Sequence, residues 1–351
     1  MWSLYYFGRT KVTTHQIKVA LGDRSYAVLV GHGVINQLET MLPKSAKRAV
    51  VITQKNVALQ PKLKIPSTTI FIGDGEEHKN IQTIEILAEK FAEFGLTRND
   101  VVIGVGGGMV TDIAGFSAAS WHRGTAVVHV ATSLVGMVDA AIGGKTGVNI
   151  AQGKNLVGAF WQPSGVICDL DALETLPQRE MRCGLGEVAK YHFLTGDDLL
   201  ALEMSERIAR CVEIKARIVA ADERESGGRA LLNYGHTLAH ALERSSNFSL
   251  AHGEAVAVGM IFAAHVAHAM QRIGAPRVDE HYRVIGETYG LKVKPDEKID
   301  RRELIELMHH DKKAVSGLTF VLDGPSGIEI VSGVAEAHLM QAFDAMQLNE
   351  K

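Results

Sequence analysis

Cysteine is scarce in this sequence, and the three cysteines, Cys168, Cys183 and Cys211, lie far apart with no Cys-x-x-Cys pair. An odd number of cysteines without a pairing pattern argues against a disulfide framework. It is typical of a protein in a reducing compartment, so we expect a cytoplasmic location.

A long hydrophobic run is also missing. The longest apolar stretch, Ala255–Ala264, is about half as long as the ~20 residues of a membrane-spanning helix, and it predicts a buried helix instead. At the N-terminus, Met1–Arg9 is apolar only briefly and has no basic region before an apolar core, so we expect no signal peptide. Neither feature indicates a membrane partner.

Charge of one sign is not in excess, since the formal net charge is -3. A balance this close to neutral gives no indication of nucleic-acid binding, and attraction for an anionic substrate must come from a local cluster of cations. The hydrophobic fraction of 46% and the charged fraction of 22% are those of a soluble globular protein. A chain of 351 residues favours two domains.

The first half of the sequence alternates strand and helix patterns. Short β-branched runs predict strands at Ala49–Thr53, Ser67–Ile72, Val101–Val105 and Ala126–Ala131, and Asn80–Phe94 has helical spacing. This alternation predicts a Rossmann-like α/β domain with a parallel sheet at residues 1–177. From 178 to 351 the pattern is mainly helical, with a late hairpin at Leu318–Leu322 and Ile328–Val331.

A glycine triplet, Gly106–Gly108, directly follows one predicted strand. Consecutive glycines there let backbone amides approach a pyrophosphate, and a following helix adds its positive end. The run is not Gly-x-Gly-x-x-Gly, and a tight turn that binds nothing is the alternative. Asp112 could contact a ribose or a carboxamide, or could be a first-turn carboxylate favoured by the helix dipole.

Three distant residues, Glu187, His236 and His252, form a candidate metal site. Two imidazoles and a carboxylate hold a divalent ion and leave a coordination position open, as catalytic zinc sites do. A single histidine is more often structural, but these two lie beside glycines and further polar groups. His240 shares a helix face with His236 and is suited to proton transfer or anion contact.

Several cations could form an anion site. Lys145, Lys154 and Asn155 lie in glycine-rich segments that we interpret as loops, where small neighbours leave an ammonium group accessible. Such residues are ordinarily solvated surface charges. Together they could hold a phosphate and a carboxylate. The other candidates are Lys190, Lys215, Arg229, Lys312 and Lys313.

These residues resemble the 3-dehydroquinate synthase family of the sugar phosphate cyclase superfamily. The matching runs include Gly184-Leu-Gly-Glu-Val-Ala-Lys190, Leu232-Asn-Tyr-Gly-His-Thr237 and His252-Gly-Glu254. Further matches follow the family's order over nearly the whole chain, at residues 74–79, 106–116, 123–124, 138–145, 153–163, 175–177, 215, 222–225, 229 and 311–313. The resemblance implies a dehydroquinate synthase-like fold with an NAD-binding domain and a metal- and substrate-binding domain.

The resemblance also implies a role for each matching residue. Zn²⁺ or Co²⁺ would be held by Glu187, His236 and His252. NAD would be contacted by Asn56, Asp74, Glu76, Lys79, Gly107, Gly108, Asp112, Thr132, Ser133, Lys145, Lys154 and Thr175. The phosphorylated keto-acid substrate would be contacted by Asp139, Lys145, Asn155, Lys190, Lys215, Arg229, Asn233, His240 and Lys312 or Lys313, of which we favour Lys312. Arg123 would reach the phosphate across the interface of a homodimer.

The sequence departs from the family pattern in three places. Ala131-Thr-Ser133 replaces Pro-Thr-Thr, an acidic residue expected near Gln54 is absent, and the segment from Lys190 to Lys215 is short. These departures affect local packing and the adenosine side, and no candidate ligand is lost.

The implied activity is the conversion of 3-deoxy-D-arabino-heptulosonate 7-phosphate to 3-dehydroquinate and phosphate, a step of aromatic amino acid biosynthesis. Three alternatives stay open. The first is a cyclase for another sugar phosphate, of the 2-deoxy-scyllo-inosose or valiolone type. The second is a metal-dependent polyol or glycerol-phosphate dehydrogenase, and the third is a nucleotide-binding regulator with a vestigial site.

Overall fold

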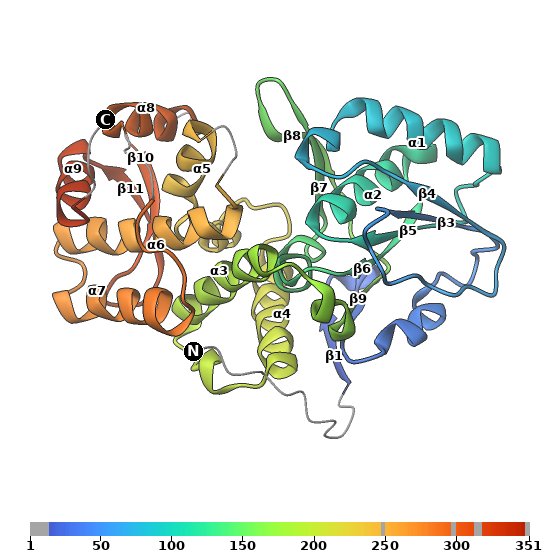
Figure 1. Cartoon of the computed structure of the whole chain (residues 1–351), viewed down its shortest axis with the longest axis horizontal. Coiled ribbons are helices and arrows are strands. Elements are labelled where there is room, and N and C mark those ends of the chain that lie inside the picture. Colours follow the sequence, from blue (N-terminus) through green and yellow to red (C-terminus); the bar gives the residue numbers. More distant parts are fainter. Residues whose placement is uncertain (1–13, 247–249, 296–299, 312–317, 348–351) are drawn as a thin grey trace. The chain divides into compact units, whose positions relative to one another are not determined.

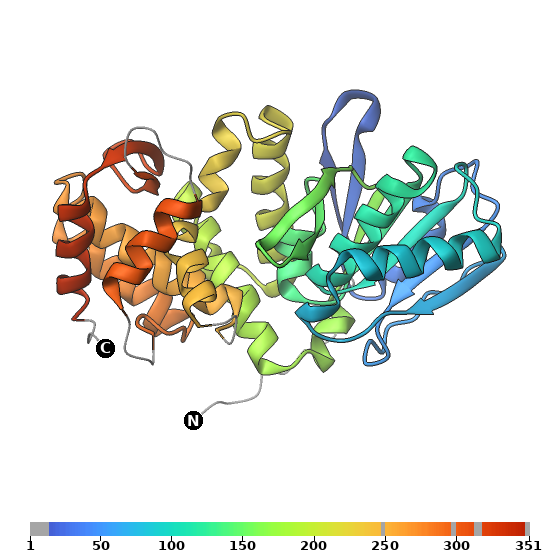
Figure 2. The same cartoon turned by 90° about the horizontal axis from the view of Figure 1, so that it is seen from above.

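The computed structural model describes residues 14–246, 250–295, 300–311 and 318–347. The chain forms two compact units. The sheet unit comprises residues 1–132, 144–175 and 204–209, and the helical unit comprises residues 133–143, 176–203 and 210–351. Each unit is described separately below (Figures 1 and 2).

A seven-stranded sheet forms the centre of the sheet unit, with the strand order β1-β2-β9-β6-β5-β3-β4. The strands are β1 (His15–Val19), β2 (Tyr26–Gly31), β3 (Ala49–Thr53), β4 (Ser67–Phe71), β5 (Val101–Gly106), β6 (Ala126–Ala131) and β9 (Gly165–Asp169). Six strands are parallel, but β1 pairs antiparallel with β2. The predicted parallel sheet is therefore confirmed for six strands, and β1 adds an antiparallel edge that the sequence pattern did not predict. Only six residues separate β1 from β2, which is too few for the crossover that parallel neighbours require.

Both faces of the sheet are covered by apolar side chains. Val50 and Ile52 of β3 pack with residues of α1 (Ile81–Phe94) and α2 (Gly108–Ser120). Ala49 and Val51, which alternate with them, pack on the other face with the short helix at Val34–Met41. Burial on both faces explains why β3 and β5 have nearly continuous β-branched sequences.

The glycine-rich segments that we predicted as loops form a hairpin instead. β7 (Lys145–Ile150) pairs antiparallel with β8 (Gly153–Phe160), and Gly147 lies opposite Gly158. A Cβ atom on Gly158 would lie 2.1 Å from the carbonyl oxygen of Thr146. These glycines therefore allow close approach of two strands, a requirement that composition alone does not distinguish from a flexible loop.

The helical unit contains α3 (Gln178–Thr195), most of α4 (Met204–Ala221), α5 (His236–Ser245), α6 (His252–Ala269), α7 (Ala275–Tyr282), α8 (Arg301–Asp311), α9 (Glu336–Ala345) and the hairpin of β10 (Leu318–Leu322) and β11 (Glu329–Val334). The helix α6 is buried on all sides, as its apolar composition predicts. Within the described residues, no helix combines the length and the hydrophobicity needed to cross a membrane.

His129 of β6 gives the sheet unit a pH-dependent stability. The side chain is 4% exposed, and burial lowers its pKa from 6.5 to about 4. Between these two values the unfolded chain binds a proton that the folded chain does not, so stability falls as the pH falls through this window. We expect His129→Leu to remove a loss of about 2 kcal/mol in the free energy of unfolding between pH 7.5 and pH 5. Urea denaturation of both proteins at both pH values measures it, and equal losses would contradict it.

Candidate active site

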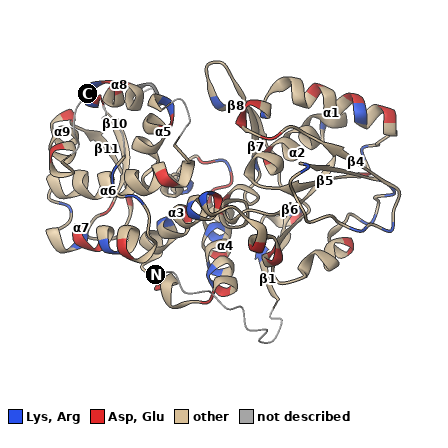
Figure 3. Cartoon of the chain, viewed as in Figure 1, with Lys and Arg blue, Asp and Glu red and all other residues tan. Residues whose placement is uncertain are grey.

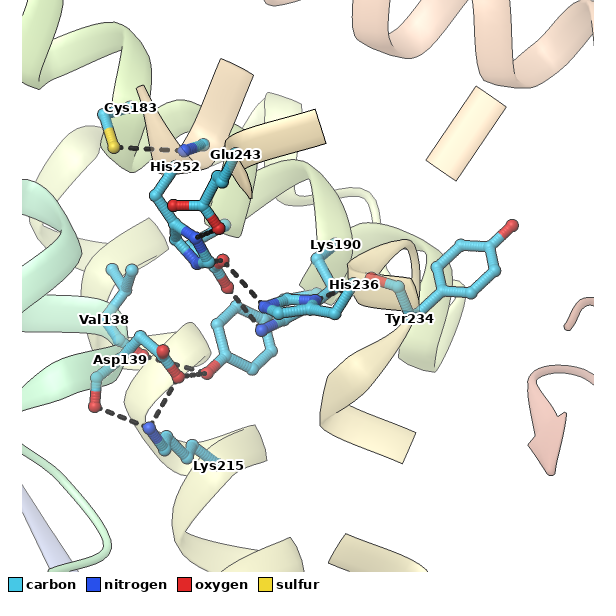
Figure 4. Close-up of polar contacts among 12 residues, drawn as sticks. Val138, Asp139, Cys183, Lys190, Lys215, Tyr234, His236, Glu243 and His252 are labelled. Carbon is cyan, nitrogen blue, oxygen red and sulfur yellow. Dashed lines mark hydrogen bonds and ion pairs between the residues drawn. The ribbon is translucent and has the colours of Figure 1, made fainter. Parts of the chain in front are cut away.

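The three predicted metal ligands converge within the helical unit, and Figure 4 shows two of them, His236 and His252, with their neighbours. Glu187 lies on α3, His236 begins α5 and His252 begins α6. The Nε2 atoms of His236 and His252 lie 3.5 Å and 3.3 Å from Oε1 of Glu187. One potential ligand atom from each residue lies within 4.8 Å of the other two, which is the spacing that a shared ion requires.

Close helix crossings hold these residues together. A Cβ atom on Gly253, next to His252, would lie 1.8 Å from the carbonyl oxygen of Cys183 on α3. A Cβ atom on Gly186, next to Glu187, would lie 2.3 Å from the carbonyl oxygen of Gly253. The pair Gly259 and Gly235 repeats this arrangement where α6 passes the start of α5, with a distance of 2.0 Å. Glycine at these positions lets the backbones approach closely enough for the ligands to meet.

The chemistry of the donor set fits a divalent ion. Glu187 is fully buried, and neither of its carboxylate oxygens forms a hydrogen bond of normal geometry with the described residues. An ionised carboxylate left in this way is costly unless a cation compensates it. Burial by itself would raise the pKa of Glu187, but Lys190, His252 and His236 together outweigh burial and lower the pKa to about 2. Burial lowers the pKa of His236 to about 3, so this imidazole is neutral and available as a ligand.

A second buried group of charges contacts the metal triad. Lys190 pairs with Glu187, and Nζ of Lys215 lies 2.5 Å from Oδ1 of Asp139. Burial opposes the charge on Asp139, but Lys215 and Lys190 hold its pKa well below the usual range. Burial lowers the pKa of Lys215, whereas Glu187 and Asp139 overcome burial and raise the pKa of Lys190. Figure 3 shows further basic positions along α4, the helix that carries Lys215.

The helical unit contains three further candidate substrate contacts, Arg229, Asn233 and His240. Arg229 is 1% exposed and donates from one guanidinium nitrogen to the carbonyl oxygen of Gly143 at 2.9 Å. Asn233 donates to Glu225 at 2.9 Å. The rings of His240 and His236 are 5.6 Å apart, as expected for residues on one helix face.

The candidate NAD residues follow the carboxyl ends of parallel strands in the sheet unit. Asn56, Asp74, Gly107 and Thr132 come after β3, β4, β5 and β6 respectively. From β3 the chain passes to β4 on one side and then to β5 on the other, so the strand order reverses between β3 and β5. Ligands of open α/β sheets bind at such a point. The glycine triplet lies there, and its Gly107 caps the N-terminus of α2.

Polar contacts connect several of these cofactor candidates. Nζ of Lys79 lies 2.5 Å from Asp112 and 2.6 Å from the side-chain oxygen of Asn155. Asp112 lies beyond the first turn of α2, so it is not the first-turn carboxylate that would interact with the helix dipole. It forms an ion pair with Lys79 instead. Asn149 joins this cluster by donating to Glu76 at 2.7 Å and accepting from the backbone of Asn155 at 2.9 Å.

The remaining predicted contacts are distributed over both units. Lys145, Lys154, Asn155 and Arg123 belong to the sheet unit, and Ser133 to the helical unit. Thr175 ends a short helix at Leu170–Thr175. Lys312 and Lys313 lie outside the described residues.

Sequence reasoning missed three buried residues beside the site. Tyr191 donates to the carbonyl oxygen of Val138 at 2.9 Å, next to Asp139. Tyr234 accepts through its carbonyl oxygen from Nδ1 of His236 at 3.1 Å. Oε2 of Glu243 lies 3.2 Å from Nδ1 of His252. The helical spacing of His236, His240 and Glu243 is a signal that could have revealed the last of them.

Comparisons with known proteins agree with this architecture. The chain superposes on a solved 2-deoxy-scyllo-inosose synthase, crystallised with carbaglucose-6-phosphate, NAD⁺ and Co²⁺, with a TM-score of 0.83 and 26% identity over 94% of this chain and 99% of that one. The family profiles named 3-dehydroquinate synthase N-terminal and C-terminal match residues 69–183 and 184–314. The fold is thus that of the sugar phosphate cyclases.

Curated relatives specify the family. A 3-dehydroquinate synthase of Thermobifida fusca (strain YX) is 40% identical over 95% of this chain and 97% of its own length. A protein of Amycolatopsis mediterranei (strain S699), provisionally named aminodehydroquinate synthase, is 49% identical over 94% of both chains. The chain belongs to the 3-dehydroquinate synthase family.

Proposed function

We propose that this chain is a 3-dehydroquinate synthase, a phosphate-eliminating lyase that converts 3-deoxy-D-arabino-heptulosonate 7-phosphate to 3-dehydroquinate and depends on NAD and a divalent metal. The observation that carries the proposal is the convergence of Glu187, His236 and His252 beside the buried cations Lys190 and Lys215. Family membership supports the choice of substrate.

The charges of the site suit an anionic substrate with several oxygen atoms. When bound, NAD⁺ supplies a hydride acceptor and the divalent ion supplies a Lewis acid that acidifies a hydroxyl group. Lys190 and Lys215 hold positive charge in a buried region, where charge stabilisation is stronger than in water. Asp139 fixes the position of Lys215, and Arg229 offers a buried guanidinium group for a carboxylate. His240 lies beside His236 and is suited to move a proton.

The assay that tests the proposal combines phosphate release with absorbance of the nicotinamide. Purified protein with NAD⁺, Co²⁺ or Zn²⁺ and heptulosonate phosphate should release phosphate without net formation of NADH. The reason is that the hydride transferred to NAD⁺ later returns to the substrate. Stoichiometric NADH would indicate a dehydrogenase. Turnover of sedoheptulose 7-phosphate alone would indicate another cyclase and would overturn the proposal.

The 49% identical relative favours a second candidate substrate. Its name specifies a product that bears an amino group, so the substrate would carry an amine at a position that is otherwise a hydroxyl. We expect a higher kcat/KM for the hydroxyl substrate when both compounds are assayed under the same conditions. A preference for the amino compound would assign the chain to the amino branch.

We further propose a cytoplasmic homodimer in which Arg123 reaches the phosphate bound by its partner. His122 and Arg123 have φ values of 50° and 61°, a conformation that is costly for residues other than glycine. Arg98 donates to the carbonyl oxygen of His122 from Nε at 3.0 Å and stabilises this turn. Backbone strain of this kind clusters at functional sites, which supports a role for the turn that presents Arg123.

A further inference from the structure

The side chain of Glu243 occupies an unusual position for a carboxylate. It lies on α5, seven residues after His236, and is 4% exposed. Its Oε2 atom lies 3.2 Å from Nδ1 of His252. Burial of a carboxylate is costly in the absence of compensating donors, and the imidazole of a candidate metal ligand supplies one of them here.

The two nitrogens of His252 face in different directions (Figure 4). Nε2 lies 3.3 Å from Oε1 of Glu187, at the centre of the triad, and Nδ1 faces Glu243. A carboxylate accepts but does not donate, so Nδ1 keeps its hydrogen toward Glu243, and a divalent ion at the triad would take the lone pair of Nε2. Glu243 therefore selects the tautomer that can bind a metal through Nε2, and it limits rotation of the ring.

His236 has the same arrangement with a different acceptor. Its Nδ1 atom lies 3.1 Å from the carbonyl oxygen of Tyr234, and its Nε2 atom faces Glu187. The phenol oxygen of Tyr234 lies 2.7 Å from Nε2 of His281, which anchors this turn. Both imidazoles thus present Nε2, but only the acceptor of His252 carries a charge. A charged acceptor increases the basicity of the ring more than a neutral carbonyl does.

We propose that Glu243 is a positioning residue for the metal centre, which holds Nε2 of His252 toward Glu187 and strengthens binding of the divalent ion. This inference rests on the proposed function in one respect, since it requires a divalent ion at the triad. It adds a residue that acts through His252 and that need not touch the substrate.

Titration of the metal-free protein with Co²⁺ tests the proposal, with the visible absorption of bound Co²⁺ and competition by a chelator as measurements. Glu243→Gln (E243Q) preserves the size of the side chain but removes the charge. We expect Co²⁺ to bind about 10- to 100-fold more weakly to E243Q, with a changed absorption spectrum. Glu243→Asp (E243D) keeps the charge on a shorter side chain, and its affinity should be intermediate.

The matched control is Asp323→Asn (D323N), which removes another buried carboxylate of the helical unit. Asp323 is 2% exposed and accepts from Arg277 at 2.6 Å. D323N should lower the thermal stability but leave the Co²⁺ affinity and spectrum unchanged. Wild-type affinity and spectrum in both E243Q and E243D would overturn the role of Glu243. An equal loss of affinity in D323N would also overturn it, because the loss would then reflect lower stability of the helical unit and not the contact with His252.

Steady-state kinetics separate a positioning role from a structural one. Excess Co²⁺ should restore much of the kcat of E243Q with no change in the KM for NAD⁺, whereas a folding defect would not respond to the metal. If the wild type binds Co²⁺ at the triad but does not turn over heptulosonate phosphate, the proposed function fails while the role of Glu243 is still decided by the titration. If the wild type binds no Co²⁺, both proposals are wrong.

Discussion

The Glu187→Gln variant (E187Q) should bind a divalent ion at least about 100-fold more weakly than the wild type and should have no measurable turnover. Residues outside the ligand set already change metal affinity about 10- to 100-fold, so loss of the anionic ligand should cost at least as much. The amide also leaves the ammonium group of Lys190 beside the site without its partner carboxylate, and this positive charge repels a dication.

E187Q should nevertheless stay folded. Removal of one partner from a buried ion pair costs about 3–5 kcal/mol, but Asp139 also stabilises the charge on Lys190. The substitution also relieves the repulsion between Glu187 and Asp139. Metal analysis with circular dichroism measures both effects, and Glu187→Asp, which retains the charge, is the control. Full metal occupancy in folded E187Q would exclude Glu187 as a ligand.

A methyl group at Gly253 should disrupt the metal site without changing any ligand. The new Cβ atom would lie 1.8 Å from the carbonyl oxygen of Cys183, so α3 and α6 would have to separate. Alanine in place of glycine ordinarily stabilises a helix by about 1 kcal/mol. Here we expect Gly253→Ala (G253A) to lower the free energy of unfolding by about 3 kcal/mol or more, because the clash involves backbone atoms that have no alternative rotamer.

The same separation should weaken metal binding, because Glu187 and His252 lie on the two helices that move apart. Gly274→Ala is the control, since its Cβ atom would make an ordinary contact of 3.5 Å with Pro276. It should change the free energy of unfolding by about 1 kcal/mol at most and leave Co²⁺ affinity unchanged. A G253A protein with wild-type stability and metal affinity would contradict the role of the glycine crossing.

Features with a local periodicity were predicted correctly from the sequence. The strands β3, β5 and β6, the helix α1 and the hairpin of β10 and β11 agree with their predicted positions within three residues. His236 and His240 share a face of α5, and Lys190 follows Glu187 by one turn of α3, because three- and four-residue spacings bring side chains together on any helix.

Features that depend on distant contacts were not predicted, or were predicted wrongly. The glycines of β7 and β8 looked like loop residues, but Gly147 and Gly158 are required by the strand that lies opposite. The antiparallel direction of β1 depends on its pairing with β2. The contact of the Glu243 carboxylate with His252 forms only because α6 places His252 beside α5.

Short stretches of this chain determine the identities of the candidate metal ligands and of the buried cations, and the helices that carry them. Whether those stretches meet depends on contacts between distant segments, such as the hydrogen bond from the backbone N–H of Gly253 to Sγ of Cys183, 70 residues away. A glycine permits such a contact but does not specify its partner, because a residue without a side chain is compatible with many neighbours. Only the packing of α3, α5 and α6 selects one partner and so assembles the site.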